Sequence, residues 1–223
     1  MSTKKETFFV FDMDGVILDS LESLSGCLIN AIEPFCQSDE QYKTFSKYDR
    51  ENPGISRFEK TDFFLESLPN TSHVKSERIK QQILDQFNSY SLDARLKSKI
   101  DESTYGLPEK IAPKNLVLLS NCDNSQLEVI AAHFGFHQIF RGGIIGTPPG
   151  KKSRFSELVD TNKSSSFVSI SDSESDAIIA RSLNISFVFI QNFARDQALW
   201  LKDGEKRFQT IGDFIFSIDQ FTE

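Results

Sequence analysis

Two aspartates that stand one residue apart, Asp12 and Asp14, are the first side chains along the chain that could do chemistry. They follow the apolar run of residues 8–11, which predicts a buried strand, and Gly15 comes directly after them. Because glycine adopts backbone angles that other residues avoid, the chain can turn sharply there. Open α/β sheets bind ligands at the carboxyl ends of their strands, and carboxylate oxygens suit Mg²⁺. The pattern therefore predicts a metal-assisted site, with a solvated turn as the alternative.

A second acidic pair, Asp172 and Asp176, follows another apolar run at residues 167–170. Asp172 would lie at the tip of a strand, where it could reach a metal ion held by Asp12. Asp176 lies four residues further on, where the entering helix returns to the same side, so it could bind a metal-bound water or hold a nearby lysine. The alternative is helix capping by Asp172 or a neighbouring serine, since such residues and an acidic first turn favour a helix start.

Two further groups stand where phosphate oxygens could be bound. Ser120 and Asn121 follow the apolar run of residues 116–119 and precede a predicted helix, so a hydroxyl and free backbone amides would meet there. Lys151 comes directly after a Pro-Pro-Gly turn and could neutralise both a phosphate and an anionic nucleophile. An N-cap serine and a surface lysine are the alternatives. Lys151 leaves the apolar residues of its helix facing the core, but Lys152 remains open as the active lysine.

An alternation of predicted strands and helices would position these groups. Predicted strands cover residues 8–11, 116–119, 166–170 and 186–190, with a short strand or bend within 138–145. Predicted helices cover residues 124–134, 151–159 and 174–183, and a closing strand and helix are expected within 210–221. Since strand and helix alternate with short connections, we predict an α/β fold with a Rossmann-like parallel sheet and helices on both faces.

The chain between the first two strands has a different, helical pattern. Predicted helices there cover residues 21–32, 42–48, 55–68 and 74–92, and Pro53-Gly54 and Pro69-Asn70 punctuate them. We therefore predict an inserted all-helical cap domain at residues 21–97, within a core domain made of residues 1–20 and 98–223. Residues 97–114 have the composition of a linker.

Composition narrows the class of protein. The chain has 223 residues, of which 39% are hydrophobic and 26% charged, as in soluble globular proteins. Its net charge of −7 argues against a nucleic-acid binder, whose surface would be basic. No apolar run has the length of a membrane span, and the first residues lack the apolar core of a secretory signal. The three cysteines are widely spaced, so we expect reduced thiols and a cytoplasmic location.

The motifs together resemble those of the haloacid dehalogenase superfamily, and the resemblance covers nearly the whole chain. The segment from Asp12 to Val16 resembles the first motif, Ser120 the second, Lys151 the third, and the segment from Asp172 through Ser173 to Asp176 the fourth. The members it suggests are those similar to phosphoglycolate phosphatase and β-phosphoglucomutase. One departure is Ser171, which stands where the fourth motif usually has glycine.

The resemblance implies a phosphoryl-transfer mechanism. Asp12 would attack phosphorus and form an aspartyl-phosphate, while Asp14 would protonate the leaving oxygen and later deprotonate the attacking water. Mg²⁺ would be bound by Asp12, Asp172 and the main-chain carbonyl of Asp14, with Asp176 and Ser173 in support. The implied ligands of the phosphoryl oxygens are Ser120, the Asn121 amide and Lys151. Asp14 separates phosphatases and phosphomutases from dehalogenases, which need no acid for an oxygen leaving group.

The helical insert offers one candidate for substrate specificity. Arg57 and Lys60 are three residues apart, so they would share a helix face, with Phe58 and Phe64 packed inward. The resemblance implies that a basic cap residue reads the leaving group of the substrate, and a planar guanidinium suits a carboxylate or clustered hydroxyls. Arg57 is therefore expected either to recognise a small polar substrate or to lie on a solvated basic face.

Three functions are compatible with these residues. The first is a Mg²⁺-dependent phosphatase acting on a small phosphorylated metabolite, either a sugar phosphate or a phosphorylated acid. The second is a phosphomutase of the β-phosphoglucomutase type, which moves phosphate within a sugar. The third is a catalytically idle binding or regulatory protein of the same fold, which is disfavoured because every motif acid is present. The oligomeric state does not follow from the sequence.

Overall fold

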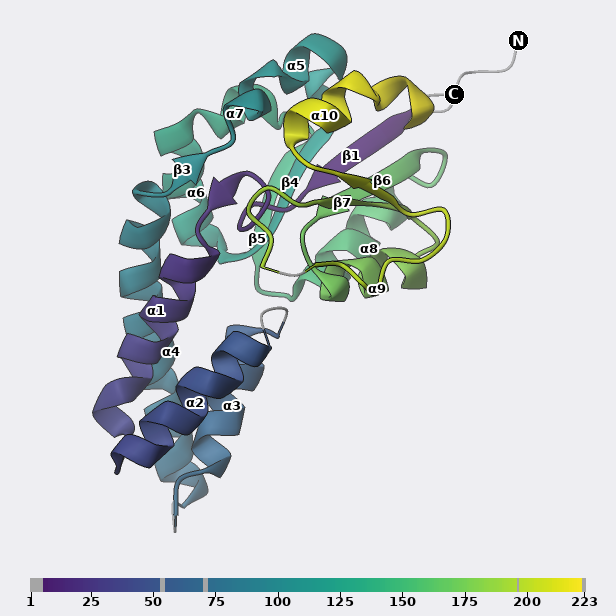
Figure 1. The fold of residues 1–223 in the computed structure, drawn as a ribbon. Helices are drawn as coiled ribbons and strands as arrows, with labels where there is room; N and C mark the ends of the chain where they lie inside the picture. The colour runs from purple at the N-terminus through teal and green to yellow at the C-terminus, as the bar shows by residue number, and fades with distance from the viewer. Residues whose placement is uncertain (1–5, 53–54, 70–71, 196, 222–223) are drawn as a thin grey trace. The chain divides into compact units, whose positions relative to one another are not determined.

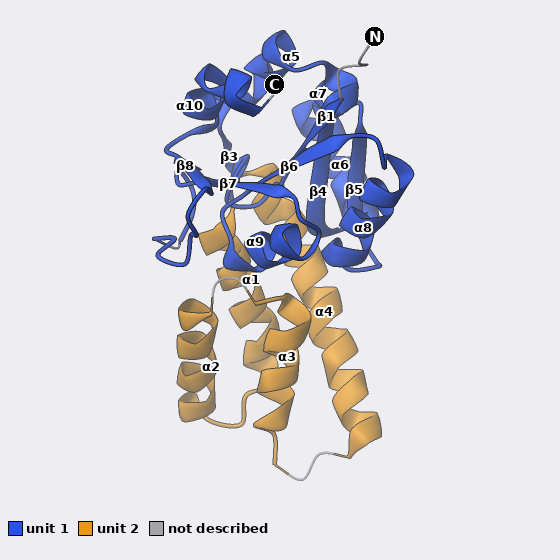
Figure 2. Ribbon diagram, turned by 90° about the vertical axis from the view of Figure 1, so that its right-hand side faces the viewer, with its two compact units in different colours: residues 1–19, 98–223 blue, residues 20–97 orange. Residues whose placement is uncertain are grey.

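The computed structural model describes residues 6–52, 55–69, 72–195 and 197–221, and the chain divides into two compact units (Figures 1 and 2). Unit 1 comprises residues 1–19 and 98–223, and unit 2 comprises residues 20–97. The boundary between residues 19 and 20 lies one residue before the predicted boundary between the core and cap domains. The boundary between residues 97 and 98 coincides with the predicted one. Pro53, Gly54 and Asn70, which the sequence pattern places in turns, lie outside the described residues.

Unit 1 is built on a six-stranded sheet with the strand order β5-β4-β1-β6-β7-β8 (Figure 1). Every pair of neighbouring strands in it is parallel. The strands are β1 (Thr7–Phe11), β4 (Leu116–Asp123), β5 (Gly143–Thr147), β6 (Ser166–Ser171), β7 (Ser186–Ile190) and β8 (Lys206–Phe208). The predicted α/β class with a parallel sheet is therefore confirmed.

Helices pack on both faces of this sheet. They are α5 (Leu107–Lys110), α6 (Asn124–Phe134), α7 (Phe136–Ile139), α8 (Lys151–Thr161), α9 (Glu174–Ser182) and α10 (Ile211–Phe216). Successive side chains of a strand point to opposite faces. Val10 of β1 accordingly packs with Phe155 of α8, whereas its neighbour Phe11 packs against Phe214 of α10, with 5.9 Å between the ring centroids.

The segment expected to be a linker, residues 97–114, is ordered structure instead. It contains β3 (Lys99–Ile100), the 3₁₀ turns η2 (Glu102–Gly106) and η3 (Pro113–Asn115), and α5. β3 pairs antiparallel with β2 (Leu18–Asp19) in a separate two-stranded sheet. Leu107 is fully buried. These elements are two to five residues long, so they give too few periodic positions for a sequence pattern to identify them.

Three strand predictions differ in extent from the structure. The short strand expected within residues 138–145 is β5, which ends at Thr147. β4 continues to Asp123, so Ser120 and Asn121 lie inside the strand rather than after it, where its register against β5 shifts. The closing strand lies before residue 210, as β8, and only α10 and η4 (Ile218–Phe221) follow it. β8 is a short edge strand with no fully buried residue, which explains why no apolar run marks it.

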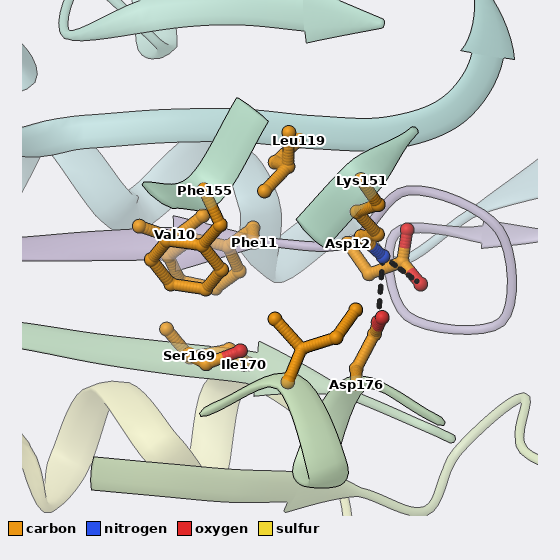
Figure 3. Close-up of a pocket in the computed structure, with 10 residues that line it drawn as sticks. Val10, Phe11, Asp12, Leu119, Lys151, Phe155, Ser169, Ile170 and Asp176 are labelled. Atoms are coloured by element: carbon orange, nitrogen blue, oxygen red, sulfur yellow. Dashed lines mark hydrogen bonds and ion pairs between the residues drawn. The ribbon is translucent and has the colours of Figure 1, made fainter. Parts of the chain in front are cut away.

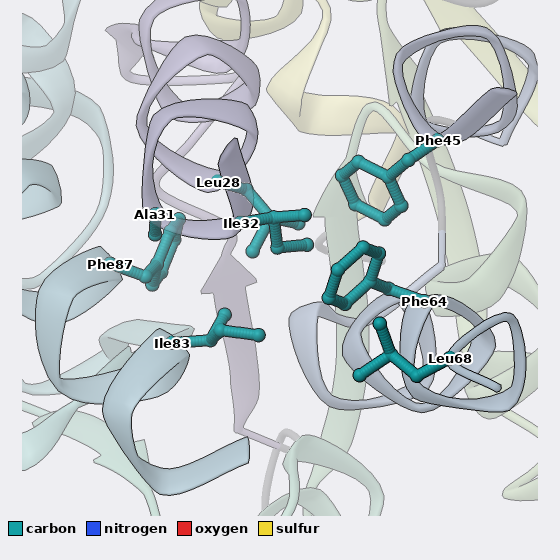
Figure 4. Close-up of a cluster of buried hydrophobic side chains, with 8 residues drawn as sticks. All are labelled: Leu28, Ala31, Ile32, Phe45, Phe64, Leu68, Ile83 and Phe87. Carbon is teal, nitrogen blue, oxygen red and sulfur yellow. The ribbon is translucent and has the colours of Figure 1, made fainter. Parts of the chain in front are cut away.

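Unit 2 is all-helical. Its helices are α1 (Leu21–Ile32), α2 (Asp39–Glu51), α3 (Arg57–Glu66) and α4 (His73–Leu96), with the 3₁₀ turn η1 (Glu33–Phe35) after α1. The helices share one apolar core, shown in Figure 4, made of Leu28, Ala31, Ile32, Phe45, Phe64, Leu68, Ile83 and Phe87. No helix in the described ranges combines the length and apolar character needed to cross a membrane.

Helix α3 begins at a well-defined cap. The Ser56 hydroxyl accepts a hydrogen bond from the Glu59 amide, and the Glu59 carboxylate accepts one from the Ser56 amide. Phe64 packs inward as predicted, but Phe58 is 44% exposed, so its predicted inward packing is wrong. Lys60 is buried and its Nζ lies 2.7 Å from Asp49 Oδ1 of α2, so it does not belong to a solvated basic face.

Candidate active site

Asp12 lies immediately after β1, and hydrogen bonds with the main chain hold it in place. Its amide donates to the Ile170 carbonyl at 2.9 Å, which continues the pairing of β1 with β6 by one residue. One carboxylate oxygen, Oδ1, accepts a hydrogen bond of 2.7 Å from the Met13 amide. The chain then turns at Gly15, whose φ of 83° lies in the left-handed region that favours glycine. Asp14, half-buried in this turn, forms a backbone bridge with Leu18.

Lys151 is the lysine that reaches Asp12. It is the first residue of α8 and is buried, whereas Lys152 is exposed. Lys151 Nζ lies 2.9 Å from Asp12 Oδ2 and 2.6 Å from Asp176 Oδ2 (Figure 3). A cation in the first turn of a helix opposes the helix dipole, so the two carboxylates are needed to stabilise its charge. Phe155 on the same helix faces the core, as expected if Lys151 is the active lysine.

Asp176 combines two roles that the sequence offers as alternatives. Its backbone amide donates to Ser173 Oγ at 3.3 Å, so Ser173 is the N-cap of α9. Its side chain accepts hydrogen bonds from Lys151 Nζ and, at 2.5 Å, from Ser171 Oγ. The helix cap and the lysine contact therefore coexist, because one uses the main chain and the other the carboxylate.

Burial and mutual repulsion set the charges of these acids. Loss of solvation raises the pKa of Asp12 to about 7, while the positive charge of Lys151 opposes this rise and the charge of Asp176 adds to it. Burial raises the pKa of Asp172 well above its usual range, reinforced by the charges of Asp12 and Asp176. Burial also disfavours the charge of Asp176, but the charge and hydrogen bond of Lys151 outweigh it and lower its pKa. Lys151 stays protonated, because Asp12 and Asp176 raise its pKa against the effect of burial.

The donor set at this strand end fits a hard cation. The described residues contain no group of three or more His, Cys, Asp or Glu side chains close enough to bind a metal ion. A divalent cation here would therefore take two carboxylates, those of Asp12 and Asp172, with main-chain or water oxygens for the rest. Mg²⁺ is commonly bound in this way, with few carboxylates and several waters. It would also relieve the repulsion from Asp12, which adds to the effect of burial in raising the pKa of Asp172.

Ser120 and Asn121 make hydrogen bonds with residues of β4 and β5. Ser120 is buried, and its Oγ accepts a hydrogen bond of 3.1 Å from the Cys122 amide. That bond uses an oxygen lone pair and not the hydroxyl proton. Asn121 is exposed, and its carbonyl accepts from the Thr147 hydroxyl at 3.1 Å. Their assignment as phosphate ligands stays a prediction.

Arg57 lies in unit 2, at the first position of α3. Its guanidinium carbon lies 4.5 Å from the centroid of the Phe58 ring and 5.7 Å from that of Phe87. Cation–π packing against these two rings accounts for part of the burial of the Arg57 side chain. The role of Arg57 in substrate recognition stays a prediction.

Ser171 is the residue whose contacts sequence reasoning missed. In the sequence it attracts notice as a departure from a glycine and as one of the serines that could cap the following helix. Its hydroxyl nevertheless contacts Asp176 Oδ2 at 2.5 Å and Asp12 Oδ2 at 3.4 Å. The alternation of side chains along β6 was the available signal, because it places Ser171 on the same face of the sheet as Phe167, which packs in the cluster beneath α8.

The raised pKa values predict how stability depends on pH in metal-free protein. The folded state binds protons at Asp12 and Asp172 more tightly than the unfolded state does. The contribution of this proton binding to the free energy of unfolding is therefore complete below about pH 4 and is lost as the pH rises. Between pH 5.5 and pH 8 the free energy of unfolding should fall, by about 1.4 kcal/mol for each unit of pKa difference titrated in that window. Asp176, with a lowered pKa, acts in the opposite direction only near or below pH 4.

Urea unfolding in excess chelator at pH 5.5 and at pH 8 measures this fall in the free energy of unfolding. Asp12→Asn should make the dependence on pH shallower, because an amide does not titrate. Asp19→Asn is the matched control, since Asp19 is exposed in the same segment and should leave the wild-type dependence intact. An unfolding midpoint that stays constant or rises with pH in the wild-type protein would contradict the raised pKa values.

Comparison with solved structures identifies the fold. A haloacid dehalogenase-like family hydrolase from Streptococcus pneumoniae matches with a TM-score of 0.68 at 16% identity, over 98% of this chain and 99% of that one. A predicted phosphatase from Clostridium acetobutylicum matches with 0.71 at 16%, over 98% and 100%. CbbY from Rhodobacter sphaeroides, solved in complex with phosphate, matches with 0.64 at 12%, over 94% and 96%.

No protein-family model matches the chain, and no curated protein matches its sequence. The structural likeness nevertheless covers both units, so the expected resemblance to the haloacid dehalogenase superfamily is confirmed for the fold. At identities of 12–17% the likeness defines the fold alone, and the function has to be argued from the site.

Proposed function

We propose that this chain is a Mg²⁺-dependent phosphatase that hydrolyses a small phosphorylated metabolite through an aspartyl-phosphate on Asp12. The observation that carries the proposal is the buried lysine, Lys151, between the carboxylates of Asp12 and Asp176 at the end of the parallel sheet. An anionic nucleophile can approach an anionic phosphate only where positive charge is concentrated. The phosphate complex of the similarly folded Rhodobacter sphaeroides protein supports a phosphate-like ligand.

Each acid has a distinct part in the proposed reaction. Asp12 attacks phosphorus, and the bond to the leaving oxygen breaks as Asp14 gives that oxygen a proton. Asp14 then takes a proton from the water that attacks the aspartyl-phosphate, which releases phosphate and restores Asp12. Lys151, the Ser120 hydroxyl and the Asn121 amide hold the phosphoryl oxygens.

Asp12, Asp172 and the main-chain carbonyl of Asp14 would bind Mg²⁺, which supplies charge neutralisation and orients the phosphoryl group. Unit 2 is the cap of this enzyme in our proposal, and a small, polar substrate is the class that such an enzyme would accept. Mutual repulsion of Asp12 and Asp172 supports the metal, because it is the electrostatic cost that a bound divalent cation removes.

The metal requirement provides the direct test. Purified protein should release inorganic phosphate from a generic aryl phosphate with Mg²⁺, lose this activity in excess chelator and regain it on readdition of Mg²⁺. Ca²⁺ should support it poorly, because its larger and looser coordination misplaces the nucleophile. Full activity in excess chelator would overturn the proposed mechanism.

A panel of phosphorylated sugars and acids then narrows the substrate. Release of inorganic phosphate indicates hydrolysis, whereas conversion of one sugar phosphate into its isomer would indicate the phosphomutase alternative. Absence of both reactions across the panel, with Mg²⁺ present, would favour the idle binding protein instead.

A further inference from the structure

Four polar groups of the candidate site form a closed ring of contacts. Lys151 Nζ lies 2.9 Å from Asp12 Oδ2 and 2.6 Å from Asp176 Oδ2. Ser171 Oγ lies 3.4 Å and 2.5 Å from the same two oxygens. Lys151 and Ser171 therefore each join the same pair of carboxylate oxygens, one as a cation and the other as a neutral hydroxyl.

The register of the sheet places Ser171 in this ring. β1 and β6 are parallel, with Val10 opposite Ser169 and Phe11 opposite Ile170, so the next pair is Asp12 and Ser171. Side chains at matching positions of neighbouring strands lie side by side on one face. A glycine at position 171 would leave that place beside Asp12 without a side chain.

The surroundings offer little that could replace the hydroxyl. Ser171 is 1% exposed, so bulk water does not reach it. The cavity next to Asp12, Lys151 and Asp176 measures about 10 Å³, at the lower limit for one water, and among the described residues Ser169 is the one other polar residue that lines it (Figure 3). Loss of the Ser171 hydroxyl would therefore remove its hydrogen bond to Asp176 Oδ2 and leave the bond from Lys151 Nζ.

We infer that Ser171 is a positioning residue, which fixes Asp176 Oδ2 and through it the Lys151 ammonium that holds Asp12 Oδ2, so that the nucleophile keeps its reactive orientation. The shorter contact shows where its single proton goes, to Asp176, whose charge strengthens the bond. With Oδ1 of Asp12 held by the Met13 amide and Oδ2 held by Lys151, both oxygens of the carboxylate are restrained. The catalytic part of this inference rests on the proposed function.

Because Ser171 acts on the nucleophile and not on the substrate, its loss should lower kcat more than it changes KM. Ser171→Ala and Ser171→Gly should each lower kcat roughly tenfold, as expected for a modest misorientation of a reacting group, with KM for an aryl phosphate changed by less than about twofold. Ser171→Thr keeps the hydroxyl and should restore most of kcat. Ser169→Ala is the matched control, on the same strand and face and also buried, and should retain wild-type kcat.

A readout without metal or turnover tests the ring itself. In metal-free protein labelled with ¹⁵N-lysine, the Lys151 ammonium signal, assigned by its absence from Lys151→Met, should show slow hydrogen exchange. That exchange should speed up in Ser171→Ala and Ser171→Gly and return towards the wild-type rate in Ser171→Thr. Urea unfolding of each variant shows whether the protein remains folded.

The outcomes separate this inference from the proposed function. Wild-type kcat and an unchanged Lys151 signal in Ser171→Ala would overturn the positioning role. Equal losses in Ser171→Thr and Ser171→Ala, or in Ser169→Ala, would overturn it too, since they would indicate a packing effect. If the wild-type protein hydrolyses no phosphate ester, the proposed function fails, while the ammonium signal still decides whether Ser171 holds the ring.

Discussion

Asp12→Asn is expected to abolish phosphate release, with a loss on the order of 10⁴-fold or more, because removal of a nucleophile eliminates the covalent route. An amide is a poor nucleophile and a poorer ligand for Mg²⁺ than a carboxylate. The substitution changes one oxygen to nitrogen, so the side chain keeps its shape beside Lys151 and the Met13 amide.

The loss should not come from unfolding. Burial raises the pKa of Asp12, so removal of its charge costs the folded metal-free protein less than the loss of an ordinary ion pair, and urea unfolding at pH 7.5 should show that Asp12→Asn remains folded. Asp19→Asn, at an exposed position of the same segment, should retain full activity. Turnover of Asp12→Asn near the wild-type rate would show that another residue is the nucleophile.

Asp14→Asn is expected to slow turnover by roughly 10²-fold or more, the usual contribution of general acid–base catalysis. The loss should depend on the leaving group, because a phenolate with electron-withdrawing substituents departs without a proton and an alkoxide does not. Alkyl phosphates should therefore suffer more than a nitrophenyl phosphate. Metal binding should persist, since in the proposed mechanism Asp14 would offer the metal only its main-chain carbonyl.

The second half of the reaction gives an independent signature of Asp14. With an activated aryl phosphate, Asp12 can still be phosphorylated, but the water that breaks the intermediate lacks its base. Intact-mass analysis during turnover should then show Asp14→Asn carrying one extra phosphoryl group, and Asp12→Asn carrying none. Equal losses on alkyl and aryl substrates without accumulation of that species would contradict the assigned role.

The sequence by itself determined the class of fold and the identity of the charged groups. Alternating apolar runs and amphipathic stretches locate β1, β6, β7, α6, α8 and α9 within a few residues, because each has enough residues to show its period. The preference for Lys151 rests on the same local periodicity, since one phase of α8 buries Phe155, but Lys152 stayed open until the structure showed Lys151 buried beside Asp12. Short elements such as β3, α5 and β8 carry no such signal and were not identified correctly.

Only the tertiary structure decided how those groups interact. Asp12 and Ser171 are 159 residues apart in sequence, and the parallel register of β1 and β6 brings their side chains together. The burial of Lys60 against Asp49 likewise depends on how α2 packs on α3, and it removes a cation that helical spacing assigns to the surface. A local pattern specifies which face of an element is apolar, whereas contacts and pKa values depend on which other element covers that face and excludes water from it.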